Sequence, residues 1–184
     1  MAHLCDPSNK PLREALDAPD GLFISRHREY IERVRSVYPH TVTFRELVTE
    51  STCVLYALRL RDERTYRAIA LNFGRQIFAG KAFMEWLVKG QLTELDKPKD
   101  GCLALYFKGA AWQHVGVVST SGRVVSQWGE FPVYEHDLCE LPARYGDEVR
   151  YFEMPLQGDF LHLFLEYAKT RGVSDGDLAK AMKT

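Results

Sequence analysis

Cys53 and His114 have the residue types and the positions that favour nucleophilic chemistry. Cys53 follows Ser51 and Thr52, both good helix N-caps, and opens the apolar helical run CVLYAL. A cysteine in the first turn of a helix lies beside unpaired backbone N–H groups and the positive end of the helix dipole, which favour a thiolate. The sequence therefore predicts a candidate nucleophile at Cys53, and the alternative is a small buried apolar residue.

His114 is a polar residue at the start of two apolar strands, HVGVV and RVVSQW, which fold back around Ser-Thr-Ser-Gly. An imidazole held by a sheet serves catalysis only beside a nucleophile or a metal, and a nearby imidazolium would lower the pKa of Cys53 further. We expect the His114 ring to lie within hydrogen-bond reach of the Cys53 sulfur. A ring that faces solvent, or a different side of the sheet from the sulfur, would remove this assignment. A half-buried sheet histidine is the alternative.

The other cysteines are weaker candidates for chemistry. Cys102 lies in GCLALYF, where a strand residue facing the core is expected, and Cys5 lies in a terminus that we expect to be flexible. Cys139 stands three residues after His136 without a second such pair, so we predict no metal site. The cysteines have no paired spacing, which argues against a disulfide framework and predicts mostly free thiols. The chain has no Gly-rich phosphate loop and no G-x-S-x-G motif, and we predict no cofactor.

The periodicity of apolar residues divides the chain into an α+β domain. Residues 1–20 are rich in proline and predict a loosely ordered lead-in, and residues 21–184 predict a single domain. Helical spacing prevails over 21–95, short β-type runs separated by turn residues occupy 101–154, and helical spacing returns over 157–183. We expect N-terminal helices packed on a small antiparallel sheet that forms a meander, with additional C-terminal helices.

Composition excludes several classes of protein. The hydrophobic content is 46%, the charged content 27% and the net charge −1, which is typical of a globular protein and gives no overall attraction to nucleic acid. No run of 18 apolar residues and no signal peptide appear, so we predict no membrane span and a cytoplasmic location, with delivery as a secreted effector left open.

The order of three features is similar to a known family. A cysteine that starts a helix, then KPKDGCLALYF, then HVGVVSTSGRVV, resembles the NlpC-type papain-like cysteine peptidases and amidases over about 51–127. The resemblance implies a papain-like core, with Cys53 as the nucleophile and His114 as the general base. It also implies a polar residue on the following strand that orients the imidazole.

The identity of that third residue depends on the register of the hairpin. A gapless count along the hairpin places Ser126 at this position. A two-residue turn would pair Val118 with Arg123 and bring Gln127 directly opposite His114, where a side-chain carbonyl could accept the Nδ1 proton. Glu130, just past the strand, is a further candidate.

The resemblance predicts a cysteine-dependent hydrolase or acyltransferase that acts on an amide, ester or thioester bond of a peptide or acyl substrate, with an effector or toxin as one possible role. The family usually has Asp-Cys-Ser around its nucleophile, whereas Thr52 and Val54 flank Cys53 here. This difference keeps open an alternative, a catalytically inactive papain-like scaffold that binds a protein partner through its C-terminal helices, above all the apolar segment DFLHLFLEYAK.

Overall fold

The computed structural model describes residues 2–17, 24–74, 77–129, 132–156 and 158–183. The helices are α1 (Lys10–Leu16), α2 (Ile24–Val37), α3 (Cys53–Ala57), α4 (Arg64–Phe73), α5 (Lys81–Val88), α6 (Asp159–Thr170) and α7 (Asp175–Ala181), with 3-10 helices η1 (Pro7–Asn9) and η2 (Ala143–Tyr145). The strands are β1 (His3–Leu4), β2 (Thr43–Leu47), β3 (Glu94–Leu95), β4 (Leu103–Lys108), β5 (Ala111–Val118), β6 (Val124–Gln127), β7 (Pro132–His136) and β8 (Glu148–Phe152).

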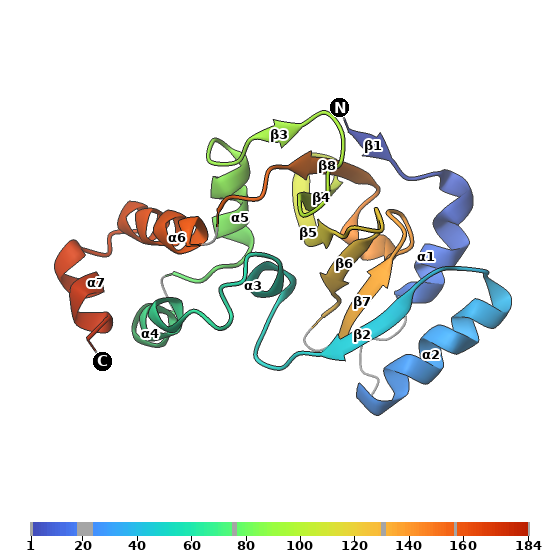
Figure 1. The fold of residues 1–184 in the computed structure, drawn as a ribbon, viewed down its shortest axis with the longest axis horizontal. Coiled ribbons are helices and arrows are strands. Elements are labelled where there is room, and N and C mark those ends of the chain that lie inside the picture. Colours follow the sequence, from blue (N-terminus) through green and yellow to red (C-terminus); the bar gives the residue numbers. More distant parts are fainter. Residues whose placement is uncertain (1, 18–23, 75–76, 130–131, 157, 184) are drawn as a thin grey trace.

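The strands form one open antiparallel sheet in the order β1-β8-β4-β5-β6-β7-β2, and β3 also pairs with β8 (Figure 1). Strands β4 to β7 follow one another as the predicted meander. Strand β8 returns to pair with β4, and β2 adds the edge beside β7. The predicted α+β class and the placement of the sheet within 101–154 are confirmed, although β2 and β3 lie in the region predicted to be helical.

Both faces of the sheet are covered, which explains why strand β4 is an almost continuous apolar run. Side chains alternate along β4, with Leu105 on one face and Tyr106 on the other. Helices α3 to α7 cover the first face, and the resulting core includes Leu103, Leu105, Val115, Phe152, Phe164 and Tyr167. We call this the first core.

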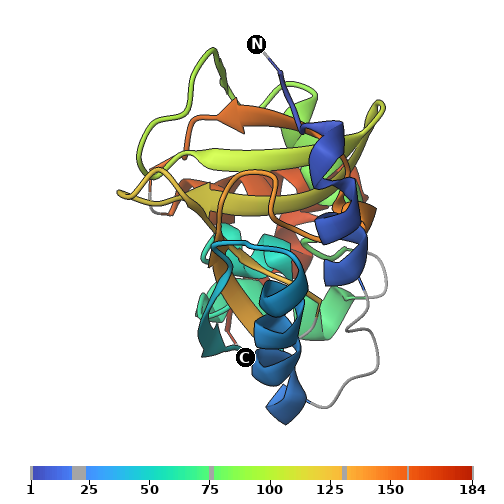
Figure 2. The same cartoon turned by 90° about the vertical axis from the view of Figure 1, so that its right-hand side faces the viewer.

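The second core lies on the opposite face of the sheet, under α1 and α2. In Figure 2, which looks from the right-hand side of Figure 1, these two helices stand in front of the strands. The second core includes Leu12, Leu16, Ile31, Cys102, Ala104, Tyr106, Val124, Trp128 and Tyr134.

The N-terminal segment is part of the second core, so the prediction of a loosely ordered lead-in over residues 1–20 is wrong for residues 3–16. Strand β1 pairs with the edge strand β8, and the Cys5 N–H donates to the Asp147 carbonyl at 2.8 Å. Leu12 and Leu16 are buried against the sheet. The proline-rich composition concealed two apolar residues four positions apart, a spacing that places both on one helix face. Residues 18–20 lie outside the described residues.

The turn between β5 and β6 sets the register of the hairpin. The Ser119 N–H donates to the Arg123 carbonyl at 2.7 Å, and Val118 pairs with Val124. The connection therefore contains three residues, Thr120 to Gly122, and Gly122 adopts a φ of 77°, which favours glycine. The alternative with a two-residue turn, which paired Val118 with Arg123, is wrong.

Candidate functional site

Cys53 is the first residue of α3, as the sequence predicts. Thr52 is the N-cap, in extended conformation, and its hydroxyl oxygen accepts the Leu55 N–H at 3.3 Å. This capping bond satisfies one of the free amides of the first turn and fixes where the helix begins. The Cys53 side chain is half-buried and packs at the margin of the first core.

The beginning of α3 lies where β5 and β6 diverge. These strands pair only at Val117 with Val125 and at Val118 with Val124, close to the turn. Farther along, the Gln127 side-chain amide of β6 donates to the Ser51 carbonyl at 3.2 Å instead. The N-terminal end of α3 thus contacts both strands at the point where their own pairing has ended.

Burial raises the pKa of the Cys53 thiol to about 11. The backbone N–H groups of Val115, Val54 and Cys53 itself favour the thiolate, but they offset the loss of hydration only in part. The amides at the helix N-terminus thus lower this pKa as expected, but burial outweighs them and the net pKa is raised. The sulfur lies beside apolar side chains as well as amides, and the apolar surroundings have the larger effect.

The His114 ring is buried, with 1% of the residue exposed. It lies opposite Tyr106 in the sheet, and the Tyr145 ring stacks on it with centroids 3.9 Å apart and planes at 14°. Both ring nitrogens are buried and have no hydrogen-bond partner among the described residues. Burial lowers the pKa of His114 well below its usual value, and positive charge on His136 or Arg144 lowers it further.

No hydrogen bond joins His114 to Cys53 in the described part of the chain. The His114 ring contacts two tyrosines of the second core, whereas Cys53 packs against the first core. The backbone nevertheless brings them near each other, because the N–H of Val115, the residue after His114, lowers the pKa of the Cys53 thiol. The sulfur thus lies beside strand β5, while the imidazole of the preceding residue projects toward the opposite face of the sheet. The expectation that the His114 ring lies within hydrogen-bond reach of the sulfur is therefore wrong for this structure.

Ser126 is bonded to a different histidine. The His136 Nδ1 lies 2.8 Å from the Asp137 carbonyl, which can only accept, so this nitrogen carries the hydrogen. The Nε2 atom must then accept the Ser126 hydroxyl at 3.0 Å, while the Trp128 indole N–H donates to the same hydroxyl at 3.0 Å. Ser126 is therefore part of a buried structural network, and the structure does not bring it to the His114 ring as an orienting group.

Gln127 is also separated from the His114 ring. Since Val117 pairs with Val125, the continued register places Gln127 opposite Val115 and not opposite His114. Its side chain bonds to Ser51, on the side of the sheet that α3 covers. The prediction that Gln127 lies opposite His114 fails because the turn is one residue longer than that alternative required. Glu130 lies outside the described residues.

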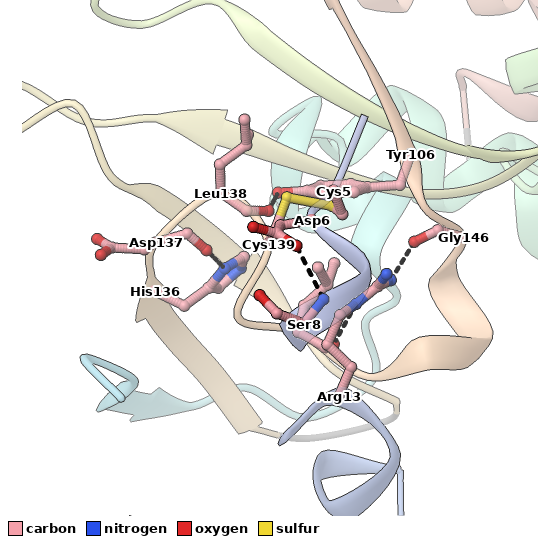
Figure 3. Close-up of a disulfide and its surroundings, with 11 residues drawn as sticks. Cys5, Asp6, Ser8, Arg13, Tyr106, His136, Asp137, Leu138, Cys139 and Gly146 are labelled. Atoms are coloured by element: carbon pink, nitrogen blue, oxygen red, sulfur yellow. Dashed lines mark hydrogen bonds between the residues drawn. A yellow bond between two sulfur atoms is a disulfide. The ribbon is translucent and has the colours of Figure 1, made fainter. Parts of the chain in front are cut away.

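Cys5 and Cys139 form a disulfide, which corrects the prediction that most cysteines are free thiols (Figure 3). The two cysteines are 134 residues apart, and their Cα atoms are separated by 5.5 Å. This pairing joins the loop after β1 to the segment that follows β7. Cys53 and Cys102 are free.

Tyr145 is the residue of this site that sequence reasoning missed. It ends η2, in a segment between β7 and β8 that has no periodic pattern from which its place could have been predicted. Its hydroxyl accepts the Gly129 N–H at 3.0 Å. Burial raises the pKa of Tyr145, and negative charge on Cys53 raises it further. Tyr145 thus contacts the His114 ring and also lies within electrostatic reach of the sulfur.

Among the described residues, no group of three or more histidine, cysteine, aspartate or glutamate side chains is placed to hold a metal ion. Within the same residues, every helix is too short or too polar to span a bilayer. Comparison of the chain with protein-family models, with curated protein sequences and with solved structures gave no match.

Proposed function

We propose that the chain is a thiol-dependent hydrolase or acyltransferase in which Cys53 is the nucleophile and His114 the base. The single observation that carries this proposal is the position of Cys53, first in a capped helix and beside the N–H of Val115. His114 is the residue before Val115, and its ring projects toward the opposite face of β5, so the proposal requires the ring to turn toward the sulfur. The papain-like character of the core is part of the proposal and rests on the order of α3, β4 and β5 along the chain.

The resting pair in this proposal is neutral, a thiol and an unprotonated imidazole. During attack the sulfur forms a bond to the carbonyl carbon of an amide, ester or thioester, and its proton passes to His114. The imidazolium returns that proton to the leaving group as the carbon–heteroatom bond breaks. Water then hydrolyses the acyl-enzyme with His114 as the base. The N–H of Cys53, at the helix N-terminus, is one donor for the oxyanion.

The raised thiol pKa and the lowered imidazole pKa both oppose proton transfer in the resting site. In addition, the ring and the sulfur face different cores at rest, so the proposal requires substrate binding to bring them together. A carbonyl substrate also removes the need for a free thiolate, because proton transfer can accompany attack.

Chromogenic amide, ester and thioester substrates test this proposal. We expect turnover of at least one class by the wild-type protein, loss of that turnover in Cys53→Ala, and retention in the matched control Cys102→Ala. Cys102 is the other free cysteine and is fully buried in the second core. Equal turnover in the Cys53→Ala variant would overturn the assignment.

A second candidate function is a protein-binding scaffold without turnover. The observation that favours it is the lack of a hydrogen-bond partner on the His114 ring, because a catalytic imidazole is normally held by such a bond. The apolar face of α6 is not free for this purpose, since Phe160, Phe164 and Tyr167 are buried in the first core. A scaffold would show no turnover, and its Cys53 would react equally fast with and without His114.

The Cys5–Cys139 disulfide also bears on where the protein acts. Disulfides persist in oxidising compartments and are uncommon in the cytosol of most cells. The pairing thus favours the secreted alternative over the cytoplasmic location expected from sequence. Mass spectrometry of the protein isolated without reductant tests this: a Cys5–Cys139 crosslink supports the secreted alternative, and alkylation of both thiols contradicts it.

A further inference from the structure

We propose that Tyr145 is the positioning residue of the site, holding the imidazole of His114 in one orientation by stacking on its face. This inference rests on the proposed function of Cys53 and His114. The orientation of the His114 ring can be tested even when no substrate is known.

The geometry of the ring pair carries the inference. The Tyr145 and His114 centroids are 3.9 Å apart with planes at 14°, whereas the Tyr106 ring lies 5.8 Å away and is tilted by 46°. His114 has no hydrogen bond at either nitrogen, so nothing polar among the described residues fixes its rotation. A flat aromatic surface against one face is then the contact that restricts how the ring can turn.

Tyr145 is itself held firmly from the N-terminal part of the chain. The Arg13 side chain donates to the Leu141 carbonyl at 3.3 Å and to the Gly146 carbonyl, on either side of η2 (Figure 3). The backbone N–H of Arg144 donates to the Asp17 carboxylate at 3.2 Å. These bonds fix the backbone before and after Tyr145.

Gly146 allows the chain to bring Tyr145 this close to the sheet. It adopts a φ of 97°, and a Cβ atom there would lie 2.2 Å from the Phe107 carbonyl oxygen. Only glycine fits this position without displacing β4. The Cys5–Cys139 disulfide closes the start of the same segment against β1.

The Tyr145 hydroxyl also lies within electrostatic reach of Cys53. It accepts the Gly129 N–H just beyond β6, and a charge on Cys53 affects its pKa. The charged or titratable groups that act on His114 are His136 and Arg144, with Tyr106 and Tyr145 as its ring neighbours.

Nuclear magnetic resonance of histidine-labelled protein tests the positioning directly, with the His114 signals assigned by their absence in His114→Ala. We expect ring-current-shifted His114 signals in the wild-type protein and in Tyr145→Phe, which keeps the stack. In Tyr145→Leu the shift should be lost, and the pKa of His114 should move toward its usual value as water enters. Unchanged His114 signals in Tyr145→Leu would overturn the proposal.

Two further variants separate positioning from a general loss of structure. If Tyr145→Leu does not fold, Tyr145→Met takes its place, because methionine is flexible and has no ring. The His114 signals should lose their ring-current shift in this variant too. The matched control is Tyr151→Leu, which removes a buried tyrosine of the second core on β8, two strands away from His114. It should leave the His114 signals unchanged, and a shift like that of Tyr145→Leu would count against a specific contact.

Acylation of Cys53 by p-nitrophenyl acetate, measured by mass spectrometry, tests the link to reactivity. We expect Tyr145→Leu to slow acylation roughly tenfold or more, because small misplacements of a catalytic group are costly, while Tyr145→Phe restores the rate. In a His114→Ala background, Tyr145→Leu should have no further effect, and an additive effect would contradict positioning through His114. If Cys53 is not acylated even in the wild-type protein, the proposed function fails, and the resonance experiment alone decides the role of Tyr145.

Discussion

Iodoacetamide alkylates the thiolate form of a cysteine, so the pH dependence of Cys53 alkylation measures the pKa that burial imposes on this residue. The thiol has a pKa of about 11, compared with an ordinary value of 9.0. Two pKa units correspond to about 3 kcal/mol and to a roughly hundredfold smaller thiolate fraction at neutral pH. We therefore expect alkylation of Cys53 to be about a hundredfold slower at pH 7 than that of an ordinary exposed thiol.

The measurement is the rate of Cys53 alkylation between pH 6 and pH 10.5, followed by peptide mass spectrometry. The rate should rise about tenfold per pH unit throughout this range, with no plateau. Cys102 is free and fully buried, so it should stay unlabelled while the protein is folded. It therefore serves in every sample as the internal control for unfolding. A plateau at or below pH 8 would show that Cys53 is a thiolate at neutral pH, and it would refute the conclusion that desolvation outweighs the neighbouring amides.

Three further predictions concern the elements that support the site. Replacing Thr52 with alanine removes the cap on the Leu55 N–H and should lower the free energy of unfolding by about 1 kcal/mol in urea denaturation. Removing the disulfide with Cys5→Ser and Cys139→Ser should lower it by about 2–5 kcal/mol, because the bond closes a long loop in the unfolded chain. Stability should also fall as the pH falls from about 6.5 to about 4. In this range the unfolded chain protonates His136, whereas burial lowers the pKa of His136 in the folded chain to about 4 and keeps the ring neutral. The resulting loss in the free energy of unfolding is about 3 kcal/mol.

Each of these predictions has a control. Thr52→Ser retains a capping hydroxyl and should be nearly neutral, so equal losses in Thr52→Ser and Thr52→Ala would argue against the cap. Reductant should destabilise the wild-type protein but not the double serine variant, and a wild-type protein insensitive to reductant would contradict the disulfide. For the acid prediction, a stability that stays constant between pH 6.5 and pH 4 would show that His136 is not held in its neutral form.

The succession of helix, sheet and helix could be predicted from the sequence because it depends on local periodicity. The change from a spacing of 3.6 to alternating runs near residue 101 locates the sheet, and Ser51-Thr52 locates the start of α3. These signals are local, since capping and amphipathic spacing involve residues within a turn or two of each other.

The contacts of the site could not be predicted in the same way. Gln127 and Ser126 exchange faces if the β5–β6 turn changes by one residue, and the sequence STSG is compatible with either length. Tyr145 stacks on His114 from a segment that Arg13, far away in the chain, helps to hold. The Cys5–Cys139 pairing likewise requires the fold, because no local spacing relates the two residues.

The acylation rate of Cys53 by p-nitrophenyl acetate at pH 7, compared between the wild-type protein and His114→Ala, tests most directly whether these two residues act as a nucleophile and its base. We predict an acyl group on Cys53 in the wild-type protein and a rate about a hundredfold or more lower without the imidazole. Equal rates in the two proteins, or an acyl group on other residues but not on Cys53, would contradict the pairing.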